Sequence, residues 1–147
     1  MLSLRLVKEF CAAQAPFRLD VAFSFSGRHR NAVLFGPSGS GKTLTMQCIA
    51  GLIRPDAGHI RLKGRTLFDS GSRLSVPPQQ RHVGYMFQDY ALFPHLTVLQ
   101  NVAFAHRGLS VRIVSRRERE RVMELLERFG IAHLADRLPA ALSGGQK

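Results

Sequence analysis

Residues 36–43, which read GPSGSGKT, have the types and spacing best suited to chemistry. They fit the pattern G-x-x-x-x-G-K followed by serine or threonine. Glycines let the backbone curl so that successive N–H groups point inward at phosphate oxygens. Lys42 is expected to reach the terminal phosphates of a nucleotide, and Thr43 to place its hydroxyl on a bridging Mg²⁺ ion. The predicted phosphate loop comprises Gly36, Pro37, Ser38, Gly39, Ser40, Gly41, Lys42 and Thr43.

Two other glycine-rich motifs do not fit this segment. A dinucleotide-binding fingerprint would need a third glycine where Leu44 stands. A hydrolase elbow, G-x-S-x-G, would need glycine where Ser40 stands. A triphosphate nucleotide is therefore the predicted ligand.

A loop of this kind must be held between a strand and a helix. The apolar run 32–35 predicts a short buried strand before it, and residues 44–52 predict a helix after it. Gly51 stands where that helix should end. The helix N-terminus would add its partial positive charge to the phosphate site.

The surrounding sequence predicts further strands. Apolar residues alternate at period two over 2–6 and 17–25, which indicates two strands. Residues 58–68, with Lys63-Gly64 at their middle, predict a β-hairpin. Residues 71–78 are expected to form a loop and 83–87 another strand.

Beyond Gln88 the pattern becomes helical. Thr97 with Gln100, and Ser115 with Glu118, both match the capping box that satisfies free N–H groups at a helix start. A stripe at helical spacing then predicts the core-facing side of a helix: Val122, Leu125, Leu126 and Phe129.

Composition sets the broader limits. The 147 residues are 45% hydrophobic, which is enough for a buried core, and no apolar run approaches the roughly 18 residues of a membrane-spanning helix. Neither the six histidines nor Cys11 and Cys48 have metal-ligand spacing. The net charge of +11 suggests an anionic partner, but many arginines alternate with glutamates after residue 111, as on a solvated helix face.

Several further motifs carry a family resemblance. The chain ends in LSGGQ, has Gln88 in YMFQ, and contains GL-x-x-P-x-x-G from Gly51 and LFPHLTVLQNV from Leu92. Together with the phosphate loop, these resemble the ABC ATPases along the whole chain. The resemblance implies an α/β P-loop NTPase of ABC type, with a mixed sheet core, an antiparallel β-subdomain and a partial helical subdomain. The implied division is residues 1–87 and 88–147.

The resemblance also implies roles for residues outside the phosphate loop. Gln88 would sense Mg²⁺ and the attacking water, and Phe17, with Phe10 in reserve, would stack on adenine. The signature segment would open a helix and cap the ATP of a second subunit in a head-to-tail dimer; it comprises Leu142, Ser143, Gly144, Gly145 and Gln146. A purely structural alternative is that Ser143 caps a helix and the glycines allow tight packing.

The chain ends at Lys147, before the aspartate, glutamate and histidine that the family places after the signature. The expectation is therefore ATP binding without appreciable turnover, and a partly exposed core.

Within the family, residues 64–98 look most like the ATPase subunits of oxyanion importers, the molybdate type above all, with sulfate, iron or polyamine import as the other candidates. This similarity implies a cytoplasmic subunit, peripheral on the inner face of the plasma membrane. Its partners would be permease subunits contacting residues 88–101 and, indirectly, a solute-binding protein. Two alternatives remain: an ABC ATPase acting on nucleic acid or ribosomes, favoured only by the charge, and a non-catalytic nucleotide-binding fragment.

Overall fold

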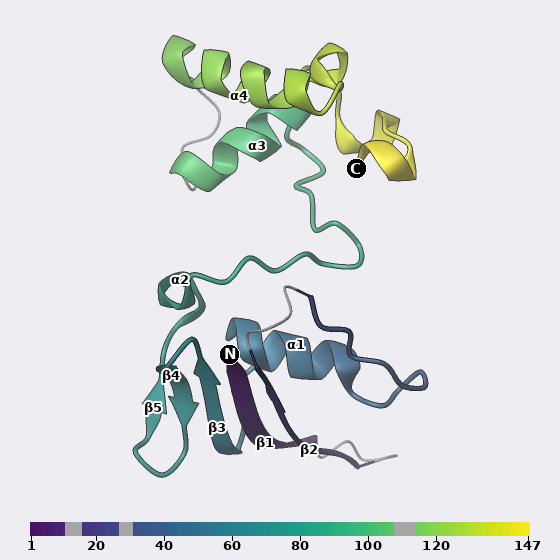
Figure 1. Cartoon of the computed structure of the whole chain (residues 1–147). Coiled ribbons are helices and arrows are strands. Elements are labelled where there is room, and N and C mark those ends of the chain that lie inside the picture. Colours follow the sequence, from purple (N-terminus) through teal and green to yellow (C-terminus); the bar gives the residue numbers. More distant parts are fainter. Residues whose placement is uncertain (11–15, 27–30, 108–113) are drawn as a thin grey trace. The chain divides into compact units, whose positions relative to one another are not determined.

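The computed structural model describes residues 1–10, 16–26, 31–107 and 114–147. These residues form two compact units, Met1–Tyr85 and Met86–Lys147, which are described separately below (Figure 1). Cys11 and Arg112 lie outside the described residues.

The first unit is built on an antiparallel sheet of order β2-β1-β3-β4-β5. Strands β1 and β2 pair along their whole length, from Leu2 opposite Phe25 to Phe10 opposite Phe17, so the two strands predicted from period-two alternation are confirmed. The strands are β1 (Leu2–Phe10), β2 (Phe17–Phe25), β3 (Ala57–Leu62), β4 (Arg65–Asp69) and β5 (Leu74–Ser75).

The predicted hairpin is confirmed as β3 and β4. Its turn residues Lys63 and Gly64 both have positive φ, 52° and 82°, as the tight turns that match strand twist require. The adjoining loop prediction for residues 71–78 is wrong in part, because Leu74–Ser75 form the short edge strand β5 against β4. Two paired residues are too few for an alternating pattern to be visible in the sequence.

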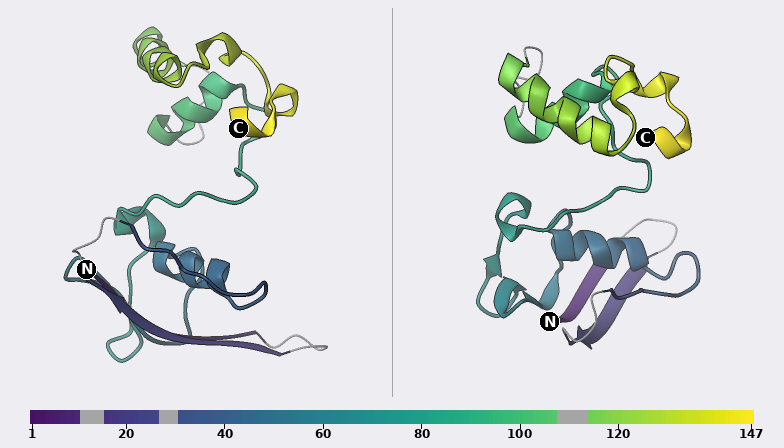
Figure 2. Two further views of the ribbon diagram at one scale, coloured as in Figure 1. Left: turned by 45° about the vertical axis from the view of Figure 1, so that its right-hand side comes forward. Right: turned by 45° about the horizontal axis from the view of Figure 1, so that its top comes forward.

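Helix α1 (Lys42–Ala50) packs on one face of this sheet (Figure 2). Its Cys48 and Ile49 lie in the same buried cluster as Leu6, Ile60 and other strand residues. The predicted helix is thus confirmed, beginning two residues earlier than expected. Gly51 ends it with φ 86° and donates its N–H to the Cys48 carbonyl.

The strands predicted at residues 32–35 and 83–87 do not form. Val33 is 88% exposed and Phe35 95% exposed, and Met86 is 89% exposed. Among the described residues, no strand pairs with either run. A buried parallel strand needs hydrogen-bonded neighbours, and without them its backbone groups stay solvated.

The first unit therefore carries the exposed apolar surface that was expected. Residues 32–34 line a cavity of about 360 Å³, and Phe23 and Met46 lie on its other walls. A short helix, α2 (Pro78–Arg81), lies later in the same unit.

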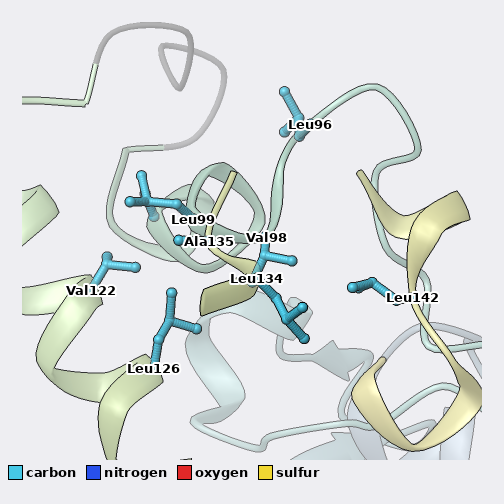
Figure 3. Close-up of a cluster of buried hydrophobic side chains, with 9 residues drawn as sticks. Leu96, Val98, Leu99, Val122, Leu126, Leu134, Ala135 and Leu142 are labelled. Carbon is cyan, nitrogen blue, oxygen red and sulfur yellow. The ribbon is translucent and has the colours of Figure 1, made fainter. Parts of the chain in front are cut away.

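In its described residues, the second unit consists of helices α3 (Val98–Arg107) and α4 (Arg116–Arg128) with three short 3₁₀ helices. The latter are η2 (Ala132–Leu134), η3 (Pro139–Ala141) and η4 (Gly144–Gln146). Figure 3 shows the apolar cluster that α3, α4 and the later segments bury together, including Leu99, Leu126, Leu134 and Leu142. These contacts fix the second unit's own core.

Both predicted capping boxes of this unit are confirmed. Thr97 N donates to Gln100 Oε1 over 2.9 Å, and Gln100 N donates to Thr97 Oγ1 over 3.3 Å. At α4, Ser115 N donates to Glu118 Oε2 over 3.1 Å. Each box satisfies donors that the helix itself leaves free.

The predicted core stripe of α4 is right for two residues and wrong for two. Val122 and Leu126 are buried, but Leu125 is 41% exposed and Phe129 73% exposed. The helix ends at Arg128, with Phe129 as its C-cap, and a helix packed on one side buries only a narrow stripe.

The described charges of α4 lie on a solvated face, as predicted. Arg116 pairs with Glu120 at 3.2 Å and Arg119 with Asp136 at 3.5 Å, and all four side chains are more than half exposed. Within the described ranges, no helix has the length and apolar character needed to cross a membrane.

Candidate nucleotide-binding site

The predicted phosphate loop is a tight turn that leads into α1. Gly39 and Gly41 adopt left-handed φ values of 79° and 86°, which only glycine takes without strain. Ser40 N donates to the Pro37 carbonyl over 3.4 Å and closes the turn. The backbone thus makes the curl that the glycine spacing predicts.

Lys42 is held inside the mouth of this loop. Its Nζ donates to the carbonyl of Gly36 over 2.8 Å and to that of Pro37 over 2.6 Å. An ammonium group has three donors and rotates freely, so it can exchange these carbonyls for phosphate oxygens without leaving the loop. The structure therefore places a cation where loop and helix meet.

The start of α1 offers an uncompensated positive end. The N-cap is Gly41, without a side-chain cap, and the first turn contains no acidic residue. Thr45 donates both its N–H and its Oγ1 hydroxyl to the Gly41 carbonyl, at 2.8 and 2.9 Å, which fixes the first turn. Thr43 is exposed on that turn. Free N–H groups and the helix dipole both favour an anion here.

Phe17 lies beside the loop. A β-carbon on Gly41 would stand 3.4 Å from Phe17 Cζ, and Phe17 is 38% exposed. Phe10 is the cross-strand partner of Phe17 and is 41% exposed, with Lys8 Nζ 5.4 Å from its ring centroid. Both phenylalanines can offer a ring face to a base, and Phe17 is the one in contact with the loop.

Gln88 belongs to the second unit, where it is exposed in the turn 88–91. The next residues, Tyr90 and Ala91, have φ values of 62° and 47°, unusual for residues other than glycine. Such backbone strain is found preferentially at functional sites. No glycine or asparagine marks this turn, so sequence reasoning missed it.

The signature segment also lies in the second unit. Leu142 is buried in that unit's core, and Ser143 is the N-cap of η4, with its own N–H donated to Gln146 Oε1 over 3.0 Å. The alternative of tightly packed glycines is wrong: a β-carbon on Gly145 would meet nothing within 4 Å, and one on Gly144 only the Tyr90 hydroxyl at 4.0 Å. Both glycines border open space.

One structural side chain of the second unit, Asn101, was not anticipated. Asn101 Nδ2 donates to the carbonyls of Phe93, Leu96 and Thr97, and its Oδ1 accepts from Phe93 N. This amide fixes the loop before α3. An asparagine inside a helix carries little signal in a single sequence.

Groups that could hold a metal without a nucleotide are not apparent. In the described part of the chain, no cluster of three or more His, Cys, Asp or Glu side chains has metal-binding geometry. The Thr43 hydroxyl and the Gln88 amide oxygen are hard oxygen donors, the kind that Mg²⁺ takes alongside phosphate oxygens.

A glycine-lined loop that encloses a lysine at the start of a helix defines the class of nucleoside-phosphate-binding proteins. Comparison with known proteins makes this specific, because residues 20–147 match the ABC transporter family. The chain belongs to that family.

Two relatives illustrate the match. The molybdate/tungstate import ATP-binding protein WtpC of Archaeoglobus fulgidus is 45% identical over 132 residues, covering 89% of this chain and 50% of the relative. The molybdenum import ATP-binding protein ModC of Paramagnetospirillum magneticum is 46% identical over 134 residues, covering 91% of this chain and 35% of the relative. The chain thus spans between a third and a half of these relatives' length.

Solved structures agree on the fold. A dimeric post-hydrolysis structure of the ATP-binding cassette MJ0796, bound to ADP and Pi, matches with a TM-score of 0.71 and 26% identity. The match covers 99% of this chain and 65% of that one. The α/β fold of an ABC ATPase cassette, expected from the sequence, is therefore confirmed.

Proposed function

We propose that this chain binds ATP with Mg²⁺ as part of the ATPase subunit of an ABC importer. The observation that carries the proposal is the position of Lys42 Nζ, held by the Gly36 and Pro37 carbonyls inside a left-handed glycine turn at the N-terminus of α1. Successive loop N–H groups and the helix end would bind the phosphates. Thr43 would hold the Mg²⁺, and Phe17 would stack on the adenine.

The two units would have different tasks. We assign residues 1–87 to the nucleotide-binding core with its β-subdomain and residues 88–147 to the helical subdomain. Gln88, exposed in a strained turn, would contact the Mg²⁺ and the attacking water. Hydrolysis would be the activity of the assembled subunit, driven by positioning and charge stabilisation.

The signature segment would act on a second subunit's nucleotide. Gly144 and Gly145 leave the start of η4 open, which suits close approach of a γ-phosphate to backbone N–H groups. MJ0796, a solved relative, is described as dimeric, which supports a pair of subunits; the head-to-tail arrangement is part of the proposal. Each ATP would then be held between one subunit's phosphate loop and the other's signature.

The transported solute would be molybdate or a related oxyanion. This rests on relatives named as molybdate or molybdenum import proteins at 43–46% identity. The chain would be cytoplasmic, peripheral on the inner face of the plasma membrane. Permease subunits would contact residues 88–101, and a solute-binding protein would act through them.

An ABC ATPase acting on nucleic acid is the less supported reading. Its one argument, the charge of +11, is weakened because arginines of α4 pair with nearby carboxylates on a solvated face. Salt-sensitive RNA binding by the purified chain would favour it. A non-catalytic nucleotide-binding module remains the other alternative.

Nucleotide binding and turnover measured together would test the proposal. A fluorescent ATP analogue is titrated with and without Mg²⁺ against the chain, Lys42→Ala and the control Arg54→Ala, which removes an exposed cation away from the loop. We expect Lys42→Ala to abolish saturable binding and Arg54→Ala to leave it unchanged. Equal binding by all three proteins would contradict the proposal.

The expectation of binding without turnover needs a separate readout. Phosphate release is followed under the same conditions, with ATP in excess over the chain so that repeated turnover can be seen. Sustained Mg²⁺-dependent release that Lys42→Ala removes would contradict the expectation while still supporting a nucleotide site.

A further inference from the structure

Arg81 is a charged side chain inside the first unit. It is 4% exposed, and its guanidinium spans two segments. Nε donates to the Val76 carbonyl over 2.8 Å, and Nη1 donates to the carbonyls of Cys48 and Ile49 over 2.8 and 2.9 Å. The side chain thus joins the segment before α2 to the last turn of α1.

The charge of this guanidinium is balanced by a helix end. Among the described residues, no carboxylate forms an ion pair with Arg81, and burial lowers the pKa of its guanidinium, which nevertheless stays protonated. The last carbonyls of a helix carry partial negative charge. Helix α1 has no basic residue of its own in its last turn, so Arg81 supplies the cation there.

The Arg81 side chain packs closely against Gly51. A β-carbon on Gly51 would stand 2.5 Å from Arg81 Nε and 2.7 Å from its Cζ. Glycine is therefore required both by the left-handed φ that ends α1 and by the room that the guanidinium occupies. The glycine that begins the family pattern GL-x-x-P-x-x-G is therefore needed here for two reasons, the helix end and the room for the Arg81 guanidinium.

In the sequence, Arg81 lies between the phosphate loop and Gln88. Helix α1 has nine residues, a rod of about 13 Å, with the phosphate loop at one end and Arg81 at the other. Arg81 is the last residue of α2, His82 reverses the backbone with φ 55°, and the chain then runs to Gln88. A shift of α1 would be passed to this connecting segment through the guanidinium.

We propose that Arg81 is a positioning residue that couples the phosphate loop to residues 82–88. This rests on the proposed nucleotide binding and goes beyond it. Phosphates bound at the start of α1 would fix that helix along its axis, and Arg81 would transmit the restraint to the segment ending at Gln88. Loss of the guanidinium would leave the loop able to bind but would disconnect the segment.

Hydrogen–deuterium exchange with and without Mg²⁺ and ATP tests this coupling. The wild type is compared with Arg81→Met, which removes the charge, and Arg81→Lys, which keeps the charge but cannot span both segments. The control is Arg65→Met: Arg65 Nη1 also donates to a carbonyl of α2, that of Gln80 over 2.9 Å, but from the exposed side. Nucleotide concentration is raised until each variant is saturated.

We expect nucleotide to slow exchange in residues 38–45 of every protein. In residues 82–88 it should slow exchange by roughly fivefold or more in the wild type and in Arg65→Met. That second effect should be absent in Arg81→Met and reduced in Arg81→Lys. If a variant only loses fold stability, its exchange measured in the absence of nucleotide should become faster. The slowing of exchange that nucleotide causes in residues 82–88 should then remain.

Two outcomes would overturn the proposal differently. If residues 82–88 of Arg81→Met, or of Arg81→Lys where the methionine variant does not fold, keep the full nucleotide-dependent slowing, the coupling is contradicted and nucleotide binding is not. If no wild-type segment responds to nucleotide, the proposed function itself is contradicted, and the coupling with it.

Discussion

The ring of Phe17 lies against the backbone of Gly41, so that a β-carbon on Gly41 would stand 3.4 Å from Phe17 Cζ. Gly41 is the residue at which the phosphate loop becomes helix α1. A ring at this position borders the path that a nucleotide would follow away from its phosphates. Its cross-strand partner Phe10 provides a matched comparison.

Replacing Phe17 with alanine should weaken ATP binding by roughly tenfold, because stacking of a base on an aromatic ring contributes about 1–3 kcal/mol. Binding of tripolyphosphate, which has no base, should not change. Competition titrations with both ligands measure this. Phe10→Ala should bind both ligands as the wild type does; the opposite ranking of the two variants would assign adenine stacking to Phe10.

Replacing Gly41 with alanine should weaken nucleotide binding by the phosphate loop more than replacing Gly39 with alanine. Both glycines have left-handed φ, which costs a residue with a β-carbon about 1–2 kcal/mol. Only at Gly41 would the new atom also collide, 2.6 Å from Leu19 Cδ1, whereas at Gly39 nothing lies within 4 Å. Fluorescent-ATP titration should therefore show at least roughly tenfold weaker binding for Gly41→Ala than for Gly39→Ala. Equal losses would mean that strain alone governs the loop.

Stability should fall at alkaline pH through Cys48. Burial raises the pKa of this thiol from 9.0 to about 11 in the folded chain. The unfolded chain therefore releases the proton first, and the stabilisation present below pH 9 is lost as pH rises toward 11. Urea unfolding at a series of pH values from neutral to just below the raised pKa measures the slope. Cys48→Ala, although less stable, should show a shallower decline; an identical slope would exclude the thiol as its cause.

Asn101→Leu should loosen the loop before α3. The amide makes four hydrogen bonds to the backbone of that loop, and removing one side of such a set costs about 1–3 kcal/mol. Exchange of the amide hydrogens in residues 92–97 should accelerate strongly. The control is Glu124→Leu, which also replaces a polar side chain with leucine but at an exposed position on α4 in the same unit. Unchanged exchange in Asn101→Leu would show that the loop is held by its apolar contacts.

Local rules predicted the elements whose causes are local. The Lys63-Gly64 turn, the Gly51 helix end and the two capping boxes each depend on residues within a few positions of one another, and all four formed. The phosphate loop belongs to the same group, because its glycines set its own backbone. These features could be read without knowing what packs around them.

Elements that depend on distant partners were not predictable in the same way. Residues 32–35 have a strand-like composition, but a strand exists only where another supplies its hydrogen bonds. Leu125 and Phe129 have the spacing of a core stripe, but the width of the buried stripe is set by what packs against α4. The sequence around Arg81 gives no sign that its side chain is buried, because only the fold brings it to the end of α1.

The exposed apolar run at residues 32–35 has a practical consequence for handling the protein. Val33 and Phe35 are exposed on a backbone that pairs with no strand of the described sheet, and exposed apolar runs with unpaired backbone groups can recruit another chain by β-pairing. Purified chain should therefore become turbid at high concentration sooner than its charge of +11 would suggest. The substitution Val33→Lys would act as a gatekeeper against such precipitation, at a site outside the phosphate loop.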